Sequence, residues 1–354
     1  MAKGRGATLQ IEGRFENVQR ERVDDGWGTA DEPLPPFKTT VTVEHAKSVL
    51  QHQKSPDIPF DLSLNAYRGC EHGCIYCYAR PSHAYMNLSP GLDFETRLFA
   101  KPDAAKLLRA ELAKPSYRCS PIALGTNTDP YQPIEREWKI TRQILEVLAE
   151  HRHPVSIVTK SSLVERDLDL LVRLATDDLV QVYISVATLD AELARRMEPR
   201  AATPRRRLQA IETLNEAGVP CGVMAAPVIP FLTDSELEKI LEAAHQHGAR
   251  SAGYVLLRLP YELKDLFKDW LATHYPLKAE HVMNRLREMR GGRENDPEFG
   301  SRFRGQGLFA DLLAQRFHKT CERLRFNLED ISLDTGLFKP PSRHGQMELF
   351  RSHS

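Results

Sequence analysis

Six short apolar runs that alternate with helical patterns constrain the fold of this chain more than any other feature. The runs lie between residues 60 and 259 and read FDLSLNAY, PIALGTNT, PVSIVTK, LVQVYISVA, PCGVMAAPVIP and SAGYVLLRL. Helices are expected between them at Pro102–Lys114, Glu137–His151, Val164–Ala175, Pro204–Ala217 and Ser235–His247. Because parallel strands need a crossover of helical length, the alternation predicts parallel pairing in an open barrel or a doubly wound sheet. In both architectures ligands bind at the carboxyl ends of the strands.

The rest of the chain is arranged around this array. With 354 residues, 41% of them hydrophobic, the chain is long enough for one large domain or two ordinary ones. Residues 1–55 are polar and predict a mostly irregular N-terminal extension, with a short strand at TTVTV and a helix near EHAKSVL. Residues 56–260 hold the array, residues 261–338 predict a helical, locally basic C-terminal region, and residues 339–354 a mobile tail.

Composition excludes some classes of protein and favours others. The 48 Lys and Arg residues balance the 48 Asp and Glu residues, so net charge alone indicates no nucleic-acid or membrane partner. The N-terminus has no secretory apolar stretch and no window approaches the roughly 20 apolar residues of a membrane span, which predicts a cytoplasmic protein without a membrane partner. Six cysteines, three of them within eight positions, favour a metal or catalytic site over a disulfide framework.

The three clustered cysteines are Cys70, Cys74 and Cys77, spaced C-x3-C-x2-C within YRGCEHGCIYCYARPSHAY. Three thiolates can hold an iron–sulfur cube whose fourth iron stays open to an external ligand. The alternative is a Cys3His zinc site that uses His72 or His83. Zinc ligands usually come in two pairs, and the chain has no second C-x2-C or H-x3-H, so zinc is the weaker alternative.

The array brings further polar segments to the same face. The cysteine run follows the first predicted strand, NTD the second, TKSS the third and SVATLD the fourth, so all four should converge at the carboxyl ends. Cys119 and Cys221 stand at strand starts on the opposite face, and Cys321 lies in a helical pattern. These three are expected to be small buried side chains.

The motif CEHGCIYC, placed after the first strand of such an array, resembles the radical S-adenosylmethionine (radical SAM) superfamily. The resemblance covers about residues 60–260 and implies an α/β fold, a partial (β/α)6 TIM-like barrel. More narrowly, GTNTDPYQPIE, VTKSS and the Tyr-x-Ser of the fourth strand resemble the branch that holds spore photoproduct lyase and relatives described as DNA repair photolyases.

The resemblance implies cofactors and roles for individual residues. Cys70, Cys74 and Cys77 would bind a [4Fe-4S] cluster, whose open iron would chelate S-adenosyl-L-methionine. One electron, from a donor such as flavodoxin or ferredoxin, would then give a 5′-deoxyadenosyl radical that abstracts a hydrogen atom. The matches to cofactor-contacting positions of the lyase are Thr128, Lys160 and Ser185, with Tyr76 against the adenine side.

Two further positions carry open or altered roles. Asp129 either holds a ribose hydroxyl or caps the turn DPYQ. Tyr78 matches a tyrosine beside the last cluster cysteine of the lyase and is the candidate catalytic residue. Thr126 stands where the lyase has a cysteine proposed to return a hydrogen atom, so the resemblance does not extend to the lyase's own substrate.

Two features near the C-terminus bear on partners. Residues 285–325 contain ten Arg or Lys but only six Asp or Glu. This excess of positive charge fits either a solvated helical region or a surface that binds the phosphates of a nucleic acid. The tail residues Gln346, Met347, Leu349 and Phe350 in QMELF resemble the bacterial sliding-clamp-binding motif.

Three functions fit these features. The first is a radical SAM enzyme that acts on DNA and is recruited by the clamp. The second is a radical SAM enzyme that modifies RNA, protein or a small molecule. The third is a non-catalytic, metal-stabilised clamp adaptor.

Overall fold

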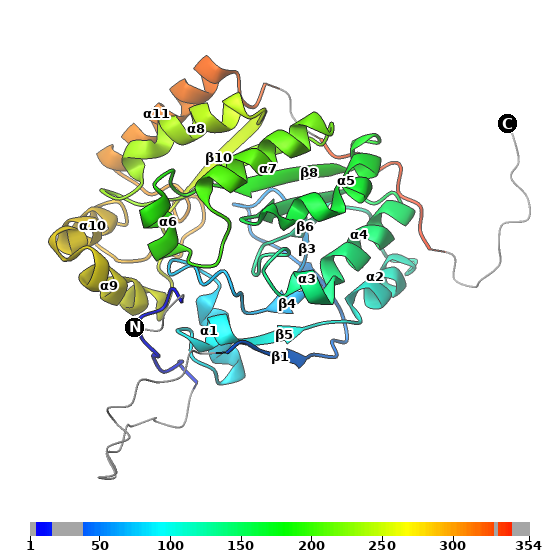
Figure 1. Ribbon diagram of the computed structural model, residues 1–354, viewed down its shortest axis with the longest axis horizontal. Coiled ribbons are helices and arrows are strands. Elements are labelled where there is room, and N and C mark those ends of the chain that lie inside the picture. Colours follow the sequence, from blue (N-terminus) through cyan, green and yellow to red (C-terminus); the bar gives the residue numbers. More distant parts are fainter. Residues whose placement is uncertain (1–4, 16–37, 329–331, 342–354) are drawn as a thin grey trace, which may run out of the picture.

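A computed structural model describes residues 5–15, 38–328 and 332–341 of the chain (Figure 1). Its main sheet has seven strands in the order β10-β9-β8-β7-β6-β3-β2. Six of them run parallel, whereas β2 (Leu50–His52) pairs antiparallel with β3 at one edge. The parallel strands are β3 (Leu62–Leu64), β6 (Ile122–Leu124), β7 (Val155–Thr159), β8 (Val180–Ser185), β9 (Cys221–Val228) and β10 (Ser251–Leu256). All six predicted strands are therefore confirmed.

The order of the strands distinguishes a barrel from a doubly wound sheet. Each parallel strand adds beside the one before it in sequence, from β3 to β10, without the reversal that defines a doubly wound sheet. Right-handed crossovers then carry every helix to the same face, and the sheet curls around the other face. Within the described residues β10 does not pair with β3, so the fold is a partial (β/α)6 barrel and the barrel is not closed.

The five predicted crossover helices are confirmed, with two interruptions, and a further helix at Ala191–Met197 was not predicted. The observed helices are α2 (Ala104–Leu112), α3 (Glu135–Trp138), α4 (Ile140–Glu150), α5 (Leu168–Ala175), α6 (Ala191–Met197), α7 (Pro204–Glu216) and α8 (Leu237–Gln246). Lys139, with a φ of +50°, separates α3 from α4, and a 3₁₀ helix (Ser162–Asp167) precedes α5. Gly218 and Gly248 follow α7 and α8 with positive φ, as the C-cap pattern predicts.

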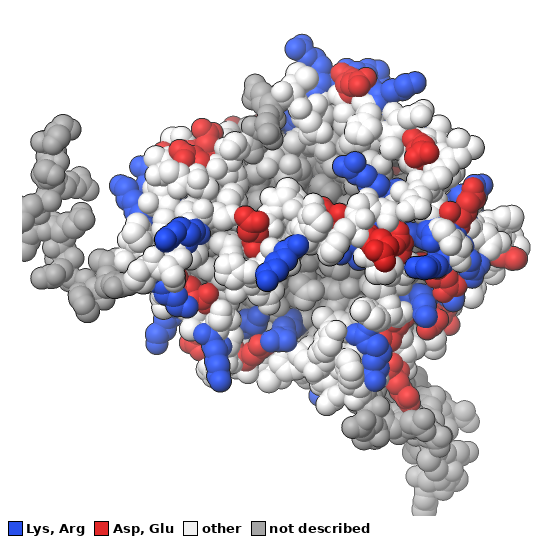
Figure 2. All heavy atoms as spheres, turned by 180° about the vertical axis from the view of Figure 1, so that it is seen from behind, with Lys and Arg blue, Asp and Glu red and all other residues white. Residues whose placement is uncertain are grey.

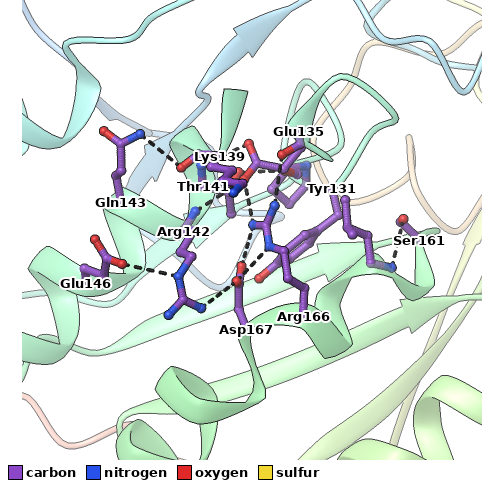
Figure 3. Close-up of polar contacts among 12 residues, drawn as sticks. Tyr131, Glu135, Lys139, Thr141, Arg142, Gln143, Glu146, Ser161, Arg166 and Asp167 are labelled. Carbon is purple, nitrogen blue, oxygen red and sulfur yellow. Dashed lines mark hydrogen bonds and ion pairs between the residues drawn. The ribbon is translucent and has the colours of Figure 1, made fainter. Parts of the chain in front are cut away.

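A polar network explains the two interruptions (Figure 3). The Glu135 carboxylate accepts the backbone N–H of Thr141 at 3.1 Å at the start of α4. Arg166, from the 3₁₀ helix, donates to the Glu135 carbonyl at 2.9 Å and to its carboxylate at 2.8 Å. Asp167 accepts from Arg166 and from Arg142. The breaks thus bring two crossovers together, and the Tyr67 hydroxyl joins them by donating to Glu135.

A second, three-stranded sheet was not foreseen from the sequence. Its order is β1-β5-β4, with β1 at Thr40–Val43, β4 at Tyr67–Arg68 and β5 at Arg97–Ala100. β4 pairs antiparallel with β5 through Tyr67 opposite Ala100. The strand expected at TTVTV is confirmed as β1. The cysteine run follows β4, so it does not follow the first barrel strand directly as the sequence suggested.

The helix expected near EHAKSVL is wrong. The end of that segment turns into β2, where Leu50 lies opposite Leu64. The preceding Val49 is buried and donates its backbone N–H to Glu111 at 2.7 Å. Pairing with an available sheet edge outweighs a weak local helical propensity.

Three helices follow the barrel: α9 (Leu263–His274), α10 (Pro276–Glu288) and α11 (Leu308–Leu324). α9 packs against α10, and α11 packs beside α8 (Figure 1). Several of the basic residues predicted here have acidic partners, such as Arg316 with Glu238 at 2.6 Å and Arg287 with Glu294 at 2.8 Å. The rear face of the molecule likewise shows basic and acidic side chains interspersed (Figure 2). A search of the described residues for a helix long and apolar enough to cross a membrane finds none.

The barrel's β10 edge is covered by chain from this C-terminal region. The backbone N–H of Leu256 donates to the carbonyl of Phe303 at 2.9 Å. At the other end of the strand, the Asn327 side chain accepts from the N–H of Ala252 at 2.9 Å and donates to its carbonyl at 3.0 Å. These bonds satisfy backbone groups that an uncovered edge strand would leave unpaired.

Candidate active site at the cysteine loop

The cysteine loop, residues 69–80, depends on two glycines. Gly69 and Gly73 have φ values of +74° and +67°, the left-handed region that glycine adopts without strain. A Cβ on Gly69 would lie 2.6 Å from a Leu98 methyl carbon, and one on Gly73 would lie 2.7 Å from a Glu95 carboxylate oxygen. Both positions therefore require glycine for the loop to fold this tightly.

Arg80 holds the loop from inside. Its guanidinium is fully buried, donates to the carbonyls of Gly73 at 3.0 Å and Cys74 at 2.8 Å, and reaches those of Pro90 and Gly91. Its charge pairs with Glu95, which is also fully buried. A buried cation without a partner would be costly, so this ion pair and the loop's shape depend on each other.

Neighbouring elements fix the backbone around the first cysteine. The N–H of Cys70 donates to the Phe94 carbonyl at 2.9 Å. Gln132 accepts from the N–H of Glu71 at 2.9 Å and donates to the Gly69 carbonyl at 3.2 Å, so it bonds on both sides of Cys70. Gln132 belongs to the GTNTDPYQPIE motif but was not predicted as a site residue.

The three cysteines are free thiols, with Cys70 and Cys74 only 7% and 8% exposed and Cys77 partly buried. Burial raises the pKa of each thiol, and negative charge on neighbouring cysteines raises the pKa of Cys70 and Cys74 further. Buried thiolates so close together call for bound cations, which a cluster's irons supply. Three cysteines, with no fourth ligand grouped with them in the described part of the chain, also match a cube with one open iron.

The donor set does not resemble a zinc site. Nδ1 of His72 lies 3.3 Å from Asp129, and Nε2 of His83 lies 3.0 Å from the Arg97 carbonyl oxygen. Among the described residues no three Cys, His, Asp or Glu side chains are grouped around a point that one metal ion could occupy. An iron–sulfur cube does not need such a point, because each thiolate binds a different iron.

Asp129 organises the segment after β6. Its Oδ1 accepts the Tyr131 N–H at 2.9 Å and the Thr159 hydroxyl at 2.6 Å, and its Oδ2 accepts the Lys160 N–H at 2.8 Å. Although burial opposes ionisation, these bonds and His72 hold the pKa of Asp129 at about 2. The turn-capping interpretation of Asp129 is therefore confirmed, and contact with a ribose hydroxyl stays a prediction.

Thr128 lies beside Asp129 and is held by Asn65, a buried residue that sequence reasoning missed. The side-chain oxygen of Asn65 accepts the backbone N–H groups of Asn127 at 3.0 Å and Thr128 at 3.2 Å. The Thr128 hydroxyl donates to the Tyr67 carbonyl at 3.3 Å, just before the cysteine loop. The segments after β3 and β6 are thereby joined.

Lys160 links the segment after β7 to the cysteine loop. Its ammonium nitrogen lies 5.7 Å from the centre of the Tyr76 ring, and its charge lowers the pKa values of Cys74 and Cys77 against the effect of burial. No acidic partner for this ammonium group is found within the described part of the chain. Lys160 is therefore a cation beside the thiols.

A buried ion pair, which sequence reasoning also missed, connects Tyr76 to Ser185. The Tyr76 hydroxyl donates to Glu198, and Glu198 pairs with Arg207, both of them buried. Arg207 donates to the Ser185 carbonyl at 2.9 Å at the end of β8. The Ser185 hydroxyl donates to the Ala226 carbonyl at 3.2 Å.

Tyr78 lies at the edge of this constellation. Its side chain is half exposed, and its hydroxyl donates to the Thr126 carbonyl after β6. Desolvation of the hydroxyl and the neighbouring Cys77 raise the pKa of Tyr78 to about 12, while Arg258 acts in the opposite direction. The phenol is therefore protonated at neutral pH.

The N-terminal residues 5–15, part of the extension that the sequence predicts to be mostly irregular, pack onto the cysteine loop. The backbone N–H groups of Gly6 and Ala7 donate to the Glu95 carboxylate at 3.0 and 2.8 Å. A Cβ on Gly6 would lie 1.8 Å from the Gly73 carbonyl oxygen, so only glycine fits. This segment covers one side of the loop.

The remaining cysteines lie apart from the site. Cys221 and Cys321 are buried as expected, but Cys119 is only half buried because it precedes β6 in a loop and lies outside the strand. QMELF, with the candidate partner-binding residues Gln346, Met347, Leu349 and Phe350, lies outside the described residues.

Comparison with known proteins defines the class. Residues 64–244, about half of the chain, match the family described as the Radical SAM superfamily, and the chain belongs to that superfamily. It is an enzyme of the radical SAM type, whose cofactors are a [4Fe-4S] cluster and S-adenosyl-L-methionine. The fold and the cofactors that the resemblance implied are thereby confirmed.

Individual relatives are similar over most of the chain. An uncharacterized protein of Mycobacterium tuberculosis is 41% identical over 234 residues, 66% of this chain and 68% of the relative. An uncharacterized protein of Methanocaldococcus jannaschii is 28% identical over 240 residues, 68% of this chain and 85% of the relative. Among solved structures, a spore photoproduct lyase mutant with bound AdoMet and dinucleoside spore photoproduct superposes with a TM-score of 0.56 at 14% identity, over 80% of this chain and 79% of the lyase.

The buried ion pair under the loop gives a stability prediction. In Glu95→Gln the Arg80 cation stays buried without its counter-charge, so the free energy of unfolding should fall by about 3–5 kcal/mol. The matched control is Glu150→Gln, which removes an exposed pair with Arg109 and should change stability by less than about 1 kcal/mol. Urea unfolding monitored by circular dichroism measures both. Equal effects of the two substitutions would contradict the role given to Arg80.

Proposed function

We propose that this enzyme abstracts a hydrogen atom from DNA in a repair or modification reaction, and that Cys70, Cys74 and Cys77 hold its cluster. The observation that carries the proposal concerns the cysteine loop. This loop holds three free thiols, and the segments after β6, β7 and β8 all contact it. DNA as the substrate class is supported by the spore photoproduct lyase structures, one of which is complexed with a dinucleoside spore photoproduct.

The three thiolates would bind three irons and leave the fourth to the methionine end of S-adenosyl-L-methionine. When bound, the cluster and this cofactor supply a 5′-deoxyadenosyl radical that abstracts a hydrogen atom. Arg80 and Gln132 keep the loop in shape around the cluster, and burial of Cys70 and Cys74 excludes water from it.

The protein's own polar groups would orient the cofactor. Lys160, whose ammonium group lies near the Tyr76 ring, would pair with the methionine carboxylate. Thr128, whose backbone is held by Asn65, and Ser185, whose backbone is held by Arg207, would also contact the cofactor, and Tyr76 would lie against the adenine. Asp129 would act mainly by fixing the backbone of Lys160, since its oxygens accept from protein groups. Tyr78, protonated and half exposed, would face the substrate as the candidate catalytic residue.

The setting of the reaction is part of the proposal. All six cysteines are free, which fits a reducing cytoplasm. The electron would come from a donor such as flavodoxin or ferredoxin.

Cysteine substitutions test the cluster site. Anaerobically reconstituted protein should carry about four irons per chain and cleave S-adenosyl-L-methionine to 5′-deoxyadenosine. Cys70→Ala, Cys74→Ala and Cys77→Ala should each abolish the cleavage and the cluster's visible absorption, whereas the control Cys119→Ala should retain both. Stoichiometric zinc, or a cluster unchanged in the three variants, would refute the assignment and leave the adaptor function standing.

Isotope transfer tests the substrate class. Oligonucleotides deuterated in their sugars and bases should transfer deuterium into 5′-deoxyadenosine if DNA is the hydrogen donor. The product is measured by mass spectrometry, with deuterated RNA of the same sequence as the matched control. Transfer from RNA alone, or from neither strand while cleavage proceeds, would reject DNA and favour RNA, a protein or a small molecule as the substrate.

We also propose that the tail recruits the enzyme to the sliding clamp through Gln346, Met347, Leu349 and Phe350. Short motifs of this kind bind when their apolar side chains fill pockets on the partner. Replacing Leu349 and Phe350 together by alanine should reduce retention on immobilised clamp at least about tenfold, while Arg351→Ala should not. Equal retention of the wild type and the double variant would remove this proposal without affecting the cluster.

A further inference from the structure

Arg258 stands immediately beyond β10, at the carboxyl edge of the barrel where the proposed active site lies. The side chain is partly buried, and its Nε atom is shielded from solvent. Across residues 5–15, 38–328 and 332–341 that Nε finds no hydrogen-bond partner, and no acidic group forms an ion pair with the guanidinium. Burial accordingly lowers the pKa of Arg258, and nearby Arg302 lowers it further.

The surroundings of Arg258 are aromatic and basic. Its guanidinium carbon lies 4.8 Å from the centre of the Phe303 ring, and that of Arg302 lies 4.8 Å from the same centre. Arg302 is neutralised, because its Nε lies 2.6 Å from the Asp57 carboxylate. Of the two cations on this ring, Arg258 is thus the one without an ion-pair partner among the described residues, although the charges of Asp57 and Asp296 act on it from further away.

The segment that carries Phe303 is built firmly in place. Buried Arg290 donates to the carbonyls of Ser301, Arg302 and Leu257 at 3.3, 2.6 and 2.8 Å. The Gly300 N–H donates to Asp57 at 2.7 Å, and the Phe303 carbonyl accepts from β10. A guanidinium stacked on such a ring is pre-organised, so binding an anion costs little side-chain entropy.

Arg258 also lies close to the cysteine loop. Its positive charge acts on the Tyr78 phenol, which is the neighbour of Cys77 in sequence and in electrostatic contact with it. Lys160 lies near the Tyr76 ring, and its charge acts on Cys77. Within the described residues the site therefore has two cations without an ion-pair partner, Lys160 near Tyr76 and Arg258 near Tyr78.

We propose that Arg258 binds a phosphodiester of the substrate strand next to the nucleotide that loses a hydrogen atom. The inference rests on the proposed function, in which Lys160 takes the carboxylate of the cofactor. A guanidinium without a counter-ion favours an anion, and its planar fork matches two phosphate oxygens. Phe299 is 59% exposed, and its ring centre lies 4.7 Å from the Arg302 guanidinium carbon, so the same loop offers an aromatic surface on which a base can stack.

Binding by the reconstituted enzyme tests this assignment without turnover. A fluorescein-labelled single-stranded DNA 12-mer is titrated at several salt concentrations and followed by anisotropy. Arg258→Gln should weaken binding about tenfold and reduce the slope of log K against log salt by about one. The matched control is Arg118→Gln, an exposed arginine that donates to the Pro115 and Tyr117 carbonyls, and it should behave as wild type.

A second arm uses inorganic phosphate and reads thermal unfolding. Phosphate should raise the melting temperature of the wild type and of Arg118→Gln but not of Arg258→Gln. Arg258→Lys keeps the charge without the fork, so it should bind the 12-mer with intermediate affinity and serves as the test variant if the glutamine variant does not fold. The affinity for S-adenosyl-L-methionine should be unchanged in all variants.

The outcomes separate this inference from the proposed function. Arg258-dependent phosphate binding without 12-mer binding would support the anion site and reject DNA as the substrate. Binding of the 12-mer with equal affinity and salt slope in the wild type and Arg258→Gln would overturn the inference and leave the DNA proposal intact. Loss of S-adenosyl-L-methionine affinity in Arg258→Gln would also overturn it, because the anion bound would then be the cofactor's carboxylate.

Discussion

A single buried cation determines the shape on which the active site depends. The carbonyls of Gly73 and Cys74 in the cysteine loop, and those of Pro90 and Gly91, lie outside any helix or strand, and buried carbonyls require donors. Arg80 supplies them from one guanidinium, whose five N–H groups in a rigid fork can serve several acceptors at once. Because hydrogen bonds within the chain hold the loop, its shape does not rely on the cluster alone. This explains why a short run of thiols and glycines adopts one conformation.

The charge of Arg80 then organises its surroundings. Glu95 neutralises it and in turn accepts from Gly6 and Ala7, so the N-terminal segment is attached to the same ion pair as the cysteine loop. A second buried pair, Glu198 with Arg207, does the same between Tyr76 and the end of β8. Buried pairs of this kind contribute little net stability but impose a single arrangement of the surrounding groups. For a site that controls a radical, such a fixed arrangement matters more than additional stability.

Much of the fold could be predicted from the sequence because it depends on local periodicity. The six strands and the five predicted crossover helices follow from apolar runs of strand length separated by helical patterns. The thiols were found through their spacing, and Lys160 through a motif. By contrast Glu198 lies 122 positions from Tyr76, and neither residue's neighbours in sequence reveal the contact. The sequence around Gly6 likewise gives no sign of its role, because it reads as part of an ordinary polar extension. In the structure Gly6 packs against Gly73, where there is no room for a side chain.

The way the open barrel is bridged restricts how a polymer can reach the thiols. The gap between its two edges is spanned by Arg302 and Gly300, which bind Asp57 just after β2. The N-terminal segment covers the cysteine loop at Glu95, and Cys70 and Cys74 are almost fully buried. Enzymes reach an atom of a base only when the base leaves the duplex stack, so a DNA substrate would have to present its target nucleotide unstacked. When a nucleotide leaves the base stack and enters an active site, the phosphates on either side of it stay outside that site. Arg258, which has no ion-pair partner among the described residues, and the exposed Phe299, on the loop that also carries Phe303, are suited to holding such a strand while its target nucleotide enters the site.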